Sequence, residues 1–411
     1  MSPLEVVLDD ASLAPALTRV GWLHRDTGRR GELIRFEYDV AWLSEPHAFA
    51  IEPLLPLAEG SFHPEDASQP HGIFQDCSPD RWGKLLMDRR EAIEAREHGR
   101  TRRALRSWDY LVGIDDGTRM GALRLRNPAD GSFAASLQPS APPVTSLREL
   151  EAAARLIEQG AGDHLDRQVR QLLVPGGSLG GARPKASFID ERGDLWLAKF
   201  PSTEDRIDVG LWEFVAYRLS IAAGISMPDA RLLSLSDRGH TFAARRFDRE
   251  GASRRMYASA RTLLNLDSDG ASYLDLAMAV QDNGAAGQVQ AGLEELFRRA
   301  LFNVLVGNRD DHLRNHGFLR EPTGWTLAPA FDVNPNPDKD VHVLALDEAN
   351  PTPDTSILLE NHAYFRLDAD RAQAIHQEVR GATRRWRDIA KEAQAHGHEI
   401  SLMESVIDPE R

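Results

Sequence analysis

A strongly amphipathic segment over residues 293–305 predicts a buried helix that ends in a polar loop. Apolar residues recur along one helical face, at Leu293, Leu296, Phe297, Ala300, Leu301, Val304 and Leu305. Gly307 then ends the helix, and a polar run follows at once. Polar residues directly after a core helix lie on a loop anchored by a rigid element, which is a common place for catalytic groups.

The polar run carries a spacing that phosphoryl transfer from Mg-ATP requires. Asp310 precedes Asn315 by five positions, and Asp332 follows in the run Phe331–Val333 after a predicted strand at Trp325–Pro329. In protein kinases an aspartate and an asparagine at this spacing, with a downstream aspartate, position the hydroxyl and hold Mg²⁺. Asp311 is an alternative base, although its spacing to Asn315 fits less well.

A glycine-rich run upstream, residues 176–185, predicts a loop that can wrap phosphate. Glycines let backbone N–H groups approach an anion closely, and nearby cations neutralise its charge. The run matches neither a Walker A loop nor a dinucleotide fingerprint, and a plain surface loop is the alternative. The candidate nucleotide-binding residues here are Gly180, Gly181, Ala182, Arg183 and Lys185.

Two further segments fit the nucleotide end of a kinase site. An alternating strand at Asp194–Phe200 ends with Lys199, and the helix after it offers Glu213 as an ion-pair partner. The segment Thr241–Phe247 predicts a strand that runs into the connection between two lobes. In kinases, adenine usually meets backbone hydrogen bonds at this connection.

Composition limits the classes of protein that the chain can belong to. The 411 residues carry a net charge of −14, which argues against a stand-alone nucleic-acid binder. The single cysteine, Cys77, excludes an intrachain disulfide framework and a cysteine-rich metal site. No export signal or long apolar run is visible, so we expect a cytoplasmic protein without a membrane partner.

The chain predicts two domains joined by a linker. Prolines and small polar residues over 128–145 separate an N-terminal subdomain, 1–127, from a core at 146–400. In the first domain, Leu33–Tyr38 alternates like a half-buried strand, and a helix is expected to begin at Ser78 with Pro79 at its first position. Ser146–Glu149 has capping-box spacing before the second domain.

Taken in order, these elements resemble the HipA family of bacterial serine/threonine kinases, the toxins of type II toxin–antitoxin pairs. The resemblance covers nearly the whole chain. It is carried by Ser178–Lys185, Lys199–Pro201, Arg246–Arg249, Asp310–Asn315 and Phe331–Val333, with Phe74–Asp80 resembling the N-terminal subdomain of the family.

The resemblance implies an α+β, bilobal fold related to protein and phosphoinositide kinases, with an added mixed α/β subdomain. It implies ATP and Mg²⁺ as cofactors, with Asp310 catalytic, Lys199 on the phosphates, and metal held by Asn315 and Asp332. His312 would brace the catalytic loop or touch phosphate. Arg245, Arg246 and Phe247 would border the adenine, and Phe331 would border the nucleotide. Ser178 would be an autophosphorylation site. Its phosphate would add about two negative charges to a phosphate-binding loop, which should repel ATP and so inactivate the protein.

Two functions from different classes follow. The first is a growth-arresting protein kinase, for which family precedent suggests an aminoacyl-tRNA synthetase as substrate. It would pair with a small helix-turn-helix antitoxin (HipB-like) and meet DNA only through that partner. The second is a catalytically weak module that binds such an antitoxin for autorepression, and a small-molecule kinase is a third option.

His312 and His316 are four positions apart, and an alternative interpretation is that they bind one zinc ion together.

Overall fold

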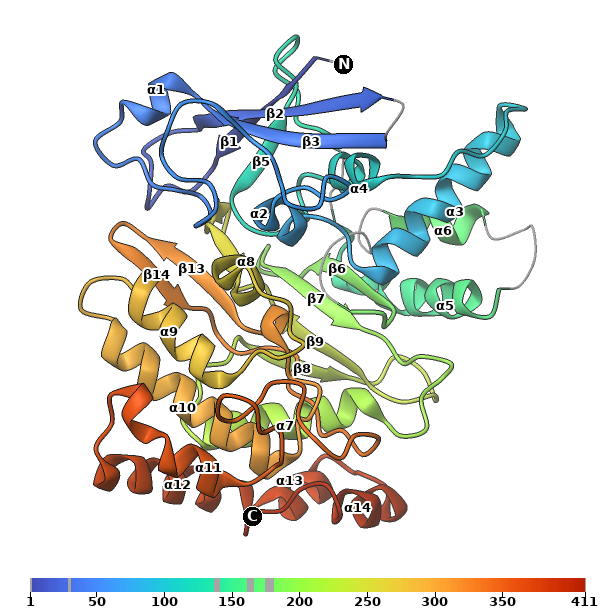
Figure 1. The fold of residues 1–411 in the computed structure, drawn as a ribbon. Helices are drawn as coiled ribbons and strands as arrows, with labels where there is room; N and C mark the ends of the chain where they lie inside the picture. The colour runs from blue at the N-terminus through green and yellow to red at the C-terminus, as the bar shows by residue number, and fades with distance from the viewer. Residues whose placement is uncertain (1, 29–30, 137–140, 161–165, 174–180, 411) are drawn as a thin grey trace. The chain divides into compact units, whose positions relative to one another are not determined.

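The chain divides into two compact units in a computed structural model that describes residues 2–28, 31–136, 141–160, 166–173 and 181–410. The first unit comprises residues 1–204 and 248–258, and the second comprises 205–247 and 259–411. Figure 1 shows the elements of both. The predicted linker and domain limits, 1–127, 128–145 and 146–400, stay predictions.

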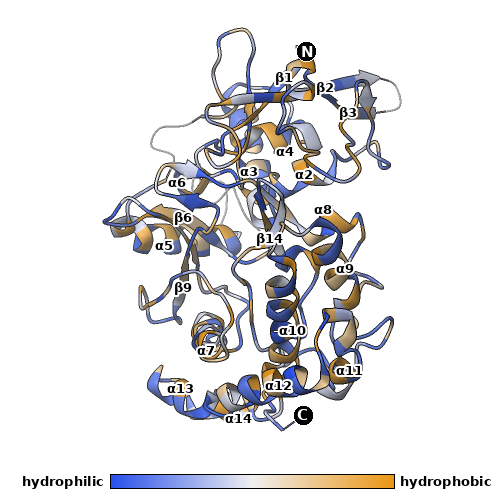
Figure 2. Ribbon diagram, turned by 90° about the vertical axis from the view of Figure 1, so that its left-hand side faces the viewer, coloured by the Kyte–Doolittle hydropathy of each residue, from blue (hydrophilic) through white to orange (hydrophobic). Residues whose placement is uncertain are grey.

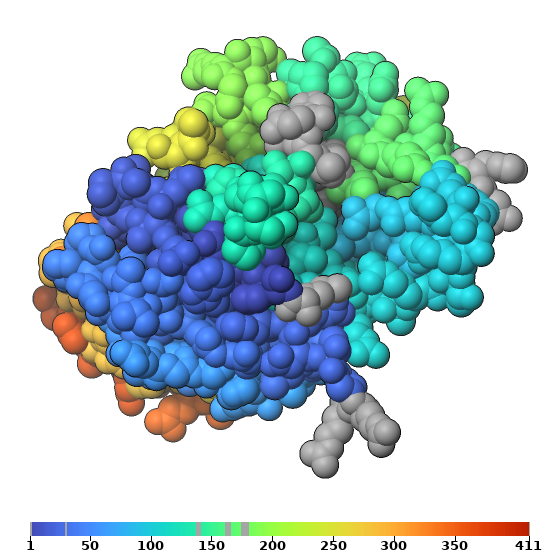
Figure 3. All heavy atoms as spheres, turned by 90° about the horizontal axis from the view of Figure 1, so that it is seen from above, coloured from blue at the N-terminus to red at the C-terminus, as the bar shows by residue number. Residues whose placement is uncertain are grey.

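A five-stranded antiparallel sheet opens the first unit. Its order is β4-β3-β2-β1-β5, from β1 (Leu4–Leu8), β2 (Thr18–Gly28), β3 (Gly31–Tyr38), β4 (Ser61–Phe62) and β5 (Leu123–Arg126). In β3, Ile34, Phe36 and Tyr38 are buried and alternate with less buried residues, which confirms the strand predicted at Leu33–Tyr38. Figure 3 shows the segment around β5 (teal) lying against the N-terminal strands (blue).

Helices and a hairpin complete the first unit. The helices are α1 (Val40–Leu43), α2 (Gly72–Asp76), α3 (Arg81–Glu97), α4 (Ser107–Gly113), α5 (Leu147–Glu158) and α6 (Asp166–Leu173), with a 3-10 turn at Val144–Ser146. Strands β6 (Lys185–Ile189) and β7 (Leu195–Lys199) pair antiparallel, in line with the strand predicted near Lys199.

Two predicted helix caps are wrong in detail. Helix α3 begins at Arg81, and Asp80 caps it by accepting from Gly83 N at 2.6 Å. Ser78 instead donates its hydroxyl to Phe74 O, because the preceding helix α2 leaves that carbonyl within reach. Ser146 does occupy the cap position of α5, but its side chain makes no capping bond, because helical backbone continues into it from the 3-10 turn.

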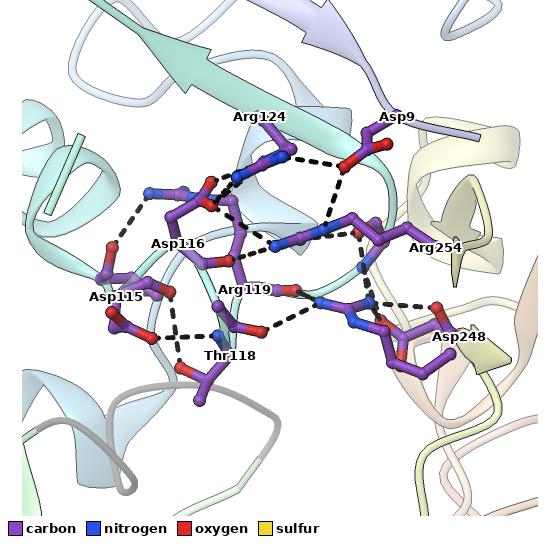
Figure 4. Close-up of polar contacts among 12 residues, drawn as sticks. Asp9, Asp115, Asp116, Thr118, Arg119, Arg124, Asp248 and Arg254 are labelled. Atoms are coloured by element: carbon purple, nitrogen blue, oxygen red, sulfur yellow. Dashed lines mark hydrogen bonds and ion pairs between the residues drawn. The ribbon is translucent and has the colours of Figure 1, made fainter. Parts of the chain in front are cut away.

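Residues 248–258 belong to the first unit although the chain on either side belongs to the second. Strands β10 (Arg249–Glu250) and β11 (Ser253–Arg254) form a short hairpin there. Figure 4 shows the polar contacts that hold it. Gly121 N donates to the fully buried Asp248 at 2.8 Å, and Arg254 donates to Asp116 O at 2.6 Å. These bonds supply the buried polar groups of the hairpin with the partners that burial requires.

The second unit is mostly helical. Its helices are α7 (Val209–Ala222), α8 (Ala260–Leu264), α9 (Tyr273–Asn283), α10 (Val289–Val306), α11 (Thr355–Glu360), α12 (Ala369–Thr383), α13 (Trp386–Glu392) and α14 (Gly397–Met403), with 3-10 turns at Leu313–Asn315 and His362–Phe365. The unit also contains two antiparallel hairpins. One pairs β8 (Ala230–Leu233) with β9 (Thr241–Arg245), and the other pairs β13 (Gly317–Glu321) with β14 (Gly324–Leu327). Strand β12 (Tyr257–Ser259) spans the change from one unit to the other.

Helix α10 is the core of the second unit, as its amphipathic pattern predicts. Every residue from Leu296 to Val306 is buried, and α9 and α12 pack against the helix. Gly307 ends it in the left-handed region with φ of 70°. A Cβ at Gly307 would stand 2.6 Å from the Val406 side chain, so glycine is required both by the backbone and by the space.

Figure 2 shows that hydrophilic as well as hydrophobic residues lie along helices such as α10. Among the described residues, no helix combines the length and the apolar content needed to cross a membrane.

Candidate functional site

The predicted catalytic loop lies between α10 and β13 in the second unit. The side chain of Asp310 is 58% exposed and forms an ion pair with Lys339. Asn315 ends a 3-10 turn in which its backbone N–H donates to His312 O at 2.8 Å. The loop therefore presents Asp310 outward while its own backbone bonds fix Asn315.

Asp311 has the opposite surroundings. Its side chain is 5% exposed, and one oxygen, Oδ2, accepts from Tyr273 Oη at 2.5 Å, His316 Nε2 at 2.7 Å and Asn303 Nδ2 at 3.0 Å. Burial alone would raise the pKa of Asp311, but the adjacent His316 and these hydrogen bonds leave the pKa below its usual value. A carboxylate held by three buried donors supports the loop, so this geometry favours Asp310 over Asp311 as the base.

The predicted metal motif lies beside Asn315. Asn315, Phe331 and Val333 line one small cavity, together with Asp311 and His316. Between those apolar neighbours, Asp332 has a φ of 59°, a left-handed conformation that costs a non-glycine residue energy and is concentrated at functional sites. Asn334 Nδ2 donates to Asp332 Oδ1 at 3.3 Å.

The donor set of this motif fits Mg²⁺ in kind. Carboxylate and amide oxygens are the hard ligands that Mg²⁺ prefers, and Asp332 and Asn315 carry one of each kind. Asn315 lines the cavity together with Phe331 and Val333, the two neighbours of Asp332. The zinc alternative receives no support: the described residues contain no group of three or more His, Cys, Asp or Glu side chains arranged to hold a metal. His316 is instead committed to Asp311.

An aromatic stack joins the metal motif to the predicted adenine segment. The rings of Phe247 and Phe331 stack with centroids 5.4 Å apart and an angle of 30°. Arg246 is buried, whereas Arg245 is half-buried and its backbone N–H donates to Asp229 O at 2.8 Å. Two sequence motifs that are 84 positions apart are thus in contact through their aromatic residues.

The segment after the metal motif is bound to the catalytic loop at several points. Asn336 N donates to Gly307 O at 2.9 Å, and Val343 N donates to Arg309 O at 3.1 Å. Arg309 Nη1 in turn donates to the carbonyl of Lys339. These bonds hold Lys339 where its ammonium group meets Asp310.

The predicted phosphate-binding residues of the first unit have different surroundings. Gly181 and Ala182 are exposed, and Arg183 and Lys199 are half-buried. Lys185 is buried and its ammonium group contacts Asp80 at 2.5 Å. Ser178 and Gly180 lie outside the described residues. Glu213, buried in α7, belongs to the second unit, so its pairing with Lys199 stays a prediction.

Several residues around these motifs escape sequence reasoning. Tyr273 and Asn303 lie 38 and 8 positions from Asp311, and no local pattern connects them with it. Lys339 lies between two aspartates and Asp80 is followed by an arginine, and charged residues in such stretches predict only solvated side chains. The run Asn334-Pro335-Asn336-Pro337 after the metal motif was a usable signal, because two prolines fix an irregular segment in one path.

Comparison with known proteins agrees with these observations. A model of the HipA-like C-terminal domain matches residues 177–395, and a model of the HipA N-terminal domain matches residues 13–111. No curated protein sequence matches the chain.

Among solved structures, the chain resembles the Shewanella oneidensis MR-1 toxin–antitoxin complex of HipA, HipB and operator DNA. The TM-score is 0.65 at 16% identity, over 98% of this chain and 94% of that chain. A second similar structure is the Helicobacter pylori proinflammatory kinase CtkA, with a TM-score of 0.36 at 15% identity, over 53% of this chain and 94% of that one. The first of these confirms the predicted fold class. Since one family model matches more than half of its length, the chain belongs to the HipA family.

Proposed function

We propose that this chain is an ATP- and Mg²⁺-dependent serine/threonine protein kinase that acts as a growth-arresting toxin. The observation that carries the proposal is the arrangement in the second unit of an exposed Asp310 and a cavity shared by Asn315 and the residues flanking Asp332. A kinase needs these groups because its catalysis consists of positioning and charge stabilisation.

Each group has a distinct task in this proposal. Asp310 accepts the proton of the attacking hydroxyl, and its exposure lets a protein substrate reach it. Asn315 and Asp332 would hold Mg²⁺, which when bound neutralises the charge of the phosphates. Lys199 and the glycine-rich residues 181–183 would bind the phosphates, while Arg245, Arg246 and Phe247 would border the adenine.

Family membership supports a proposal about regulation and partners. The S. oneidensis relative is solved with HipB and operator DNA. We propose likewise a small DNA-binding antitoxin as the partner of this chain, DNA contact through that partner, a cytoplasmic location, and silencing by autophosphorylation of Ser178. An aminoacyl-tRNA synthetase remains the proposed substrate class.

The test is phosphate transfer by the parent and by the variant Asp310→Ala. With Mg-ATP and a hydroxyl-bearing protein substrate, Asp310→Ala should fold like the parent and transfer phosphate at least about a hundredfold more slowly. Normal transfer by a folded Asp310→Ala protein would overturn the assignment. Absence of nucleotide binding by the parent, with stable antitoxin binding, would instead favour a catalytically weak interaction module.

A further inference from the structure

A buried ion pair links the N-terminal subdomain to the end of the glycine-rich run. Lys185 Nζ lies 2.5 Å from Asp80 Oδ2, and the two side chains are 1% and 4% exposed. The residues are 105 positions apart in the chain but lie within the same compact unit. Buried charges are retained only when they are paired and hydrogen-bonded, so each of these groups depends on the other.

Asp80 holds the lysine while it caps a helix. Its second oxygen, Oδ1, accepts from Gly83 N at 2.6 Å at the start of α3. The carboxylate is therefore oriented by a rigid helix end, and its remaining oxygen is aimed at Lys185. The ammonium group also donates to Gly181 O at 3.1 Å, which ties the lysine back to the glycine-rich run.

The backbone of Lys185 is held by the same helix. The indole Nε1–H of the buried Trp82 donates to Lys185 O at 3.1 Å. Asp80 and Trp82, two residues apart, thus bind the side chain and the backbone carbonyl of Lys185, respectively. The position of Gly181 is also constrained, since its φ of +103° favours glycine and an added Cβ would come within 3.4 Å of Lys185 Nζ.

Lys185 stands directly opposite Lys199 in the pairing of β6 with β7. Residues directly opposite each other on antiparallel strands project to the same face, and like charges there repel. Asp80 neutralises one of the two cations. Next to this pair, Phe200 N donates to Pro184 O at 2.9 Å, so the strand that carries Lys199 is in register with the segment that Asp80 and Trp82 fix.

We propose that Asp80 and Trp82 are positioning residues of the nucleotide site. They fix the position of Lys185, which is then a structural residue rather than a ligand of the ATP phosphates. This inference rests on the proposed kinase function and refines it. The N-terminal subdomain then acts on nucleotide binding through residues 181–185. Their placement beside Lys199 depends on a carboxylate and an indole that lie outside the kinase core.

The test is a double-mutant cycle of Asp80→Asn, Lys185→Met and the double variant in the full chain. Each single variant leaves one buried charge without its partner, whereas the double variant leaves none. We expect each single variant to bind Mg-ATP about tenfold more weakly in calorimetric titrations, and the double variant to return to within about threefold of the parent. The double variant also keeps the test valid if a single variant fails to fold.

A direct phosphate contact by Lys185 predicts the reverse pattern. Asp80→Asn would then bind Mg-ATP like the parent, and the double variant would be at least as weak as Lys185→Met. That result would overturn the proposal. The matched control is Asp166→Asn. It removes an exposed ion pair between Asp166, at the start of α6, and Arg96 of α3, and it should leave ATP affinity unchanged.

A second measurement does not depend on ATP. Amide hydrogen exchange over residues 181–189 in the ligand-free protein should become at least fivefold faster in Asp80→Asn and in Trp82→Phe, which keeps a ring but loses the N–H donor. Unchanged exchange rates in both variants would overturn the proposal that Asp80 and Trp82 hold this segment in place. If the parent failed to bind ATP, the proposed kinase function would fail, whereas the exchange result would still decide whether Asp80 and Trp82 hold this segment.

Discussion

Asp310 and Asp311 are consecutive residues with opposite surroundings. Asp310 points outward and pairs with Lys339, whereas one oxygen of Asp311 accepts hydrogen bonds from Tyr273, Asn303 and His316. The first carboxylate can reach a substrate, and the second holds the loop in place. The two neighbours should therefore fail in different ways when they are replaced.

Replacing Asp311 should act on stability. Asp311→Ala leaves three buried donors without their acceptor, so we expect a loss of about 3 kcal/mol in the free energy of unfolding. Asp310→Ala is the matched control and should change that free energy by less than about 1 kcal/mol. Urea unfolding of both variants checks this, and equal destabilisation would contradict the division of roles.

Replacing Lys339 should act on the rate of transfer. Its ion pair with Asp310 is exposed, so Lys339→Met should leave stability within about 1 kcal/mol of the parent. Because its ammonium group lies at the proposed base, we expect kcat to fall about tenfold with little change in KM for ATP. Lys391→Met, in α13, is the control for loss of a surface cation. A kcat equal to that of the control would show that Lys339 has no role in phosphate transfer.

Gly307 should tolerate no side chain. Gly307→Ala combines a left-handed backbone with a clash against Val406, and we expect a loss of about 2–4 kcal/mol in stability. Gly381→Ala, in the interior of α12, meets no atom within 4 Å and should be neutral or stabilising by about 1 kcal/mol. Thermal unfolding of the two variants gives the comparison, and a neutral Gly307→Ala would show that α10 can end differently.

Acid should release a contact between α3 and the segment that follows it. The hydrogen bond from Arg100 lowers the pKa of Glu91 to about 2. Because its pKa in the folded state is depressed, Glu91 stabilises the fold above its ordinary pKa of about 4.3, and this contribution is lost as the pH falls toward 2. Stability measured between pH 5 and 2 should therefore fall less steeply in Glu91→Gln than in the parent. An equal slope would contradict the assignment, and the exposed Glu348→Gln serves as the control.

The sequence predicts local structure well where one periodic pattern dominates. The apolar face of α10 and its end at Gly307 agree with the structure, as do the strands β3, β7 and β14. The helix start at Ser78 is wrong because a better acceptor, Asp80, follows two residues later, and a cap is decided by geometry that sequence spacing does not contain.

Long-range polar contacts account for most of what sequence reasoning missed. The spacing of Asp310, Asn315 and Asp332 is a local pattern and can be recognised. The donors to Asp311, the ion pair of Lys185 with Asp80, and the docking of Asp248 on Gly121 join residues that are distant in the chain. A single charged residue predicts a solvated side chain, and only the fold shows that it is buried and paired.

The measurement that tests the central claim most directly is the intact mass of the purified protein after incubation with Mg-ATP, followed by peptide mapping, with Asp332→Ala alongside. The account predicts the gain of one phosphate, mapped to Ser178, in the parent and none in the variant. A parent that gains no phosphate and binds no nucleotide would contradict the proposal that this HipA-family chain is an active kinase.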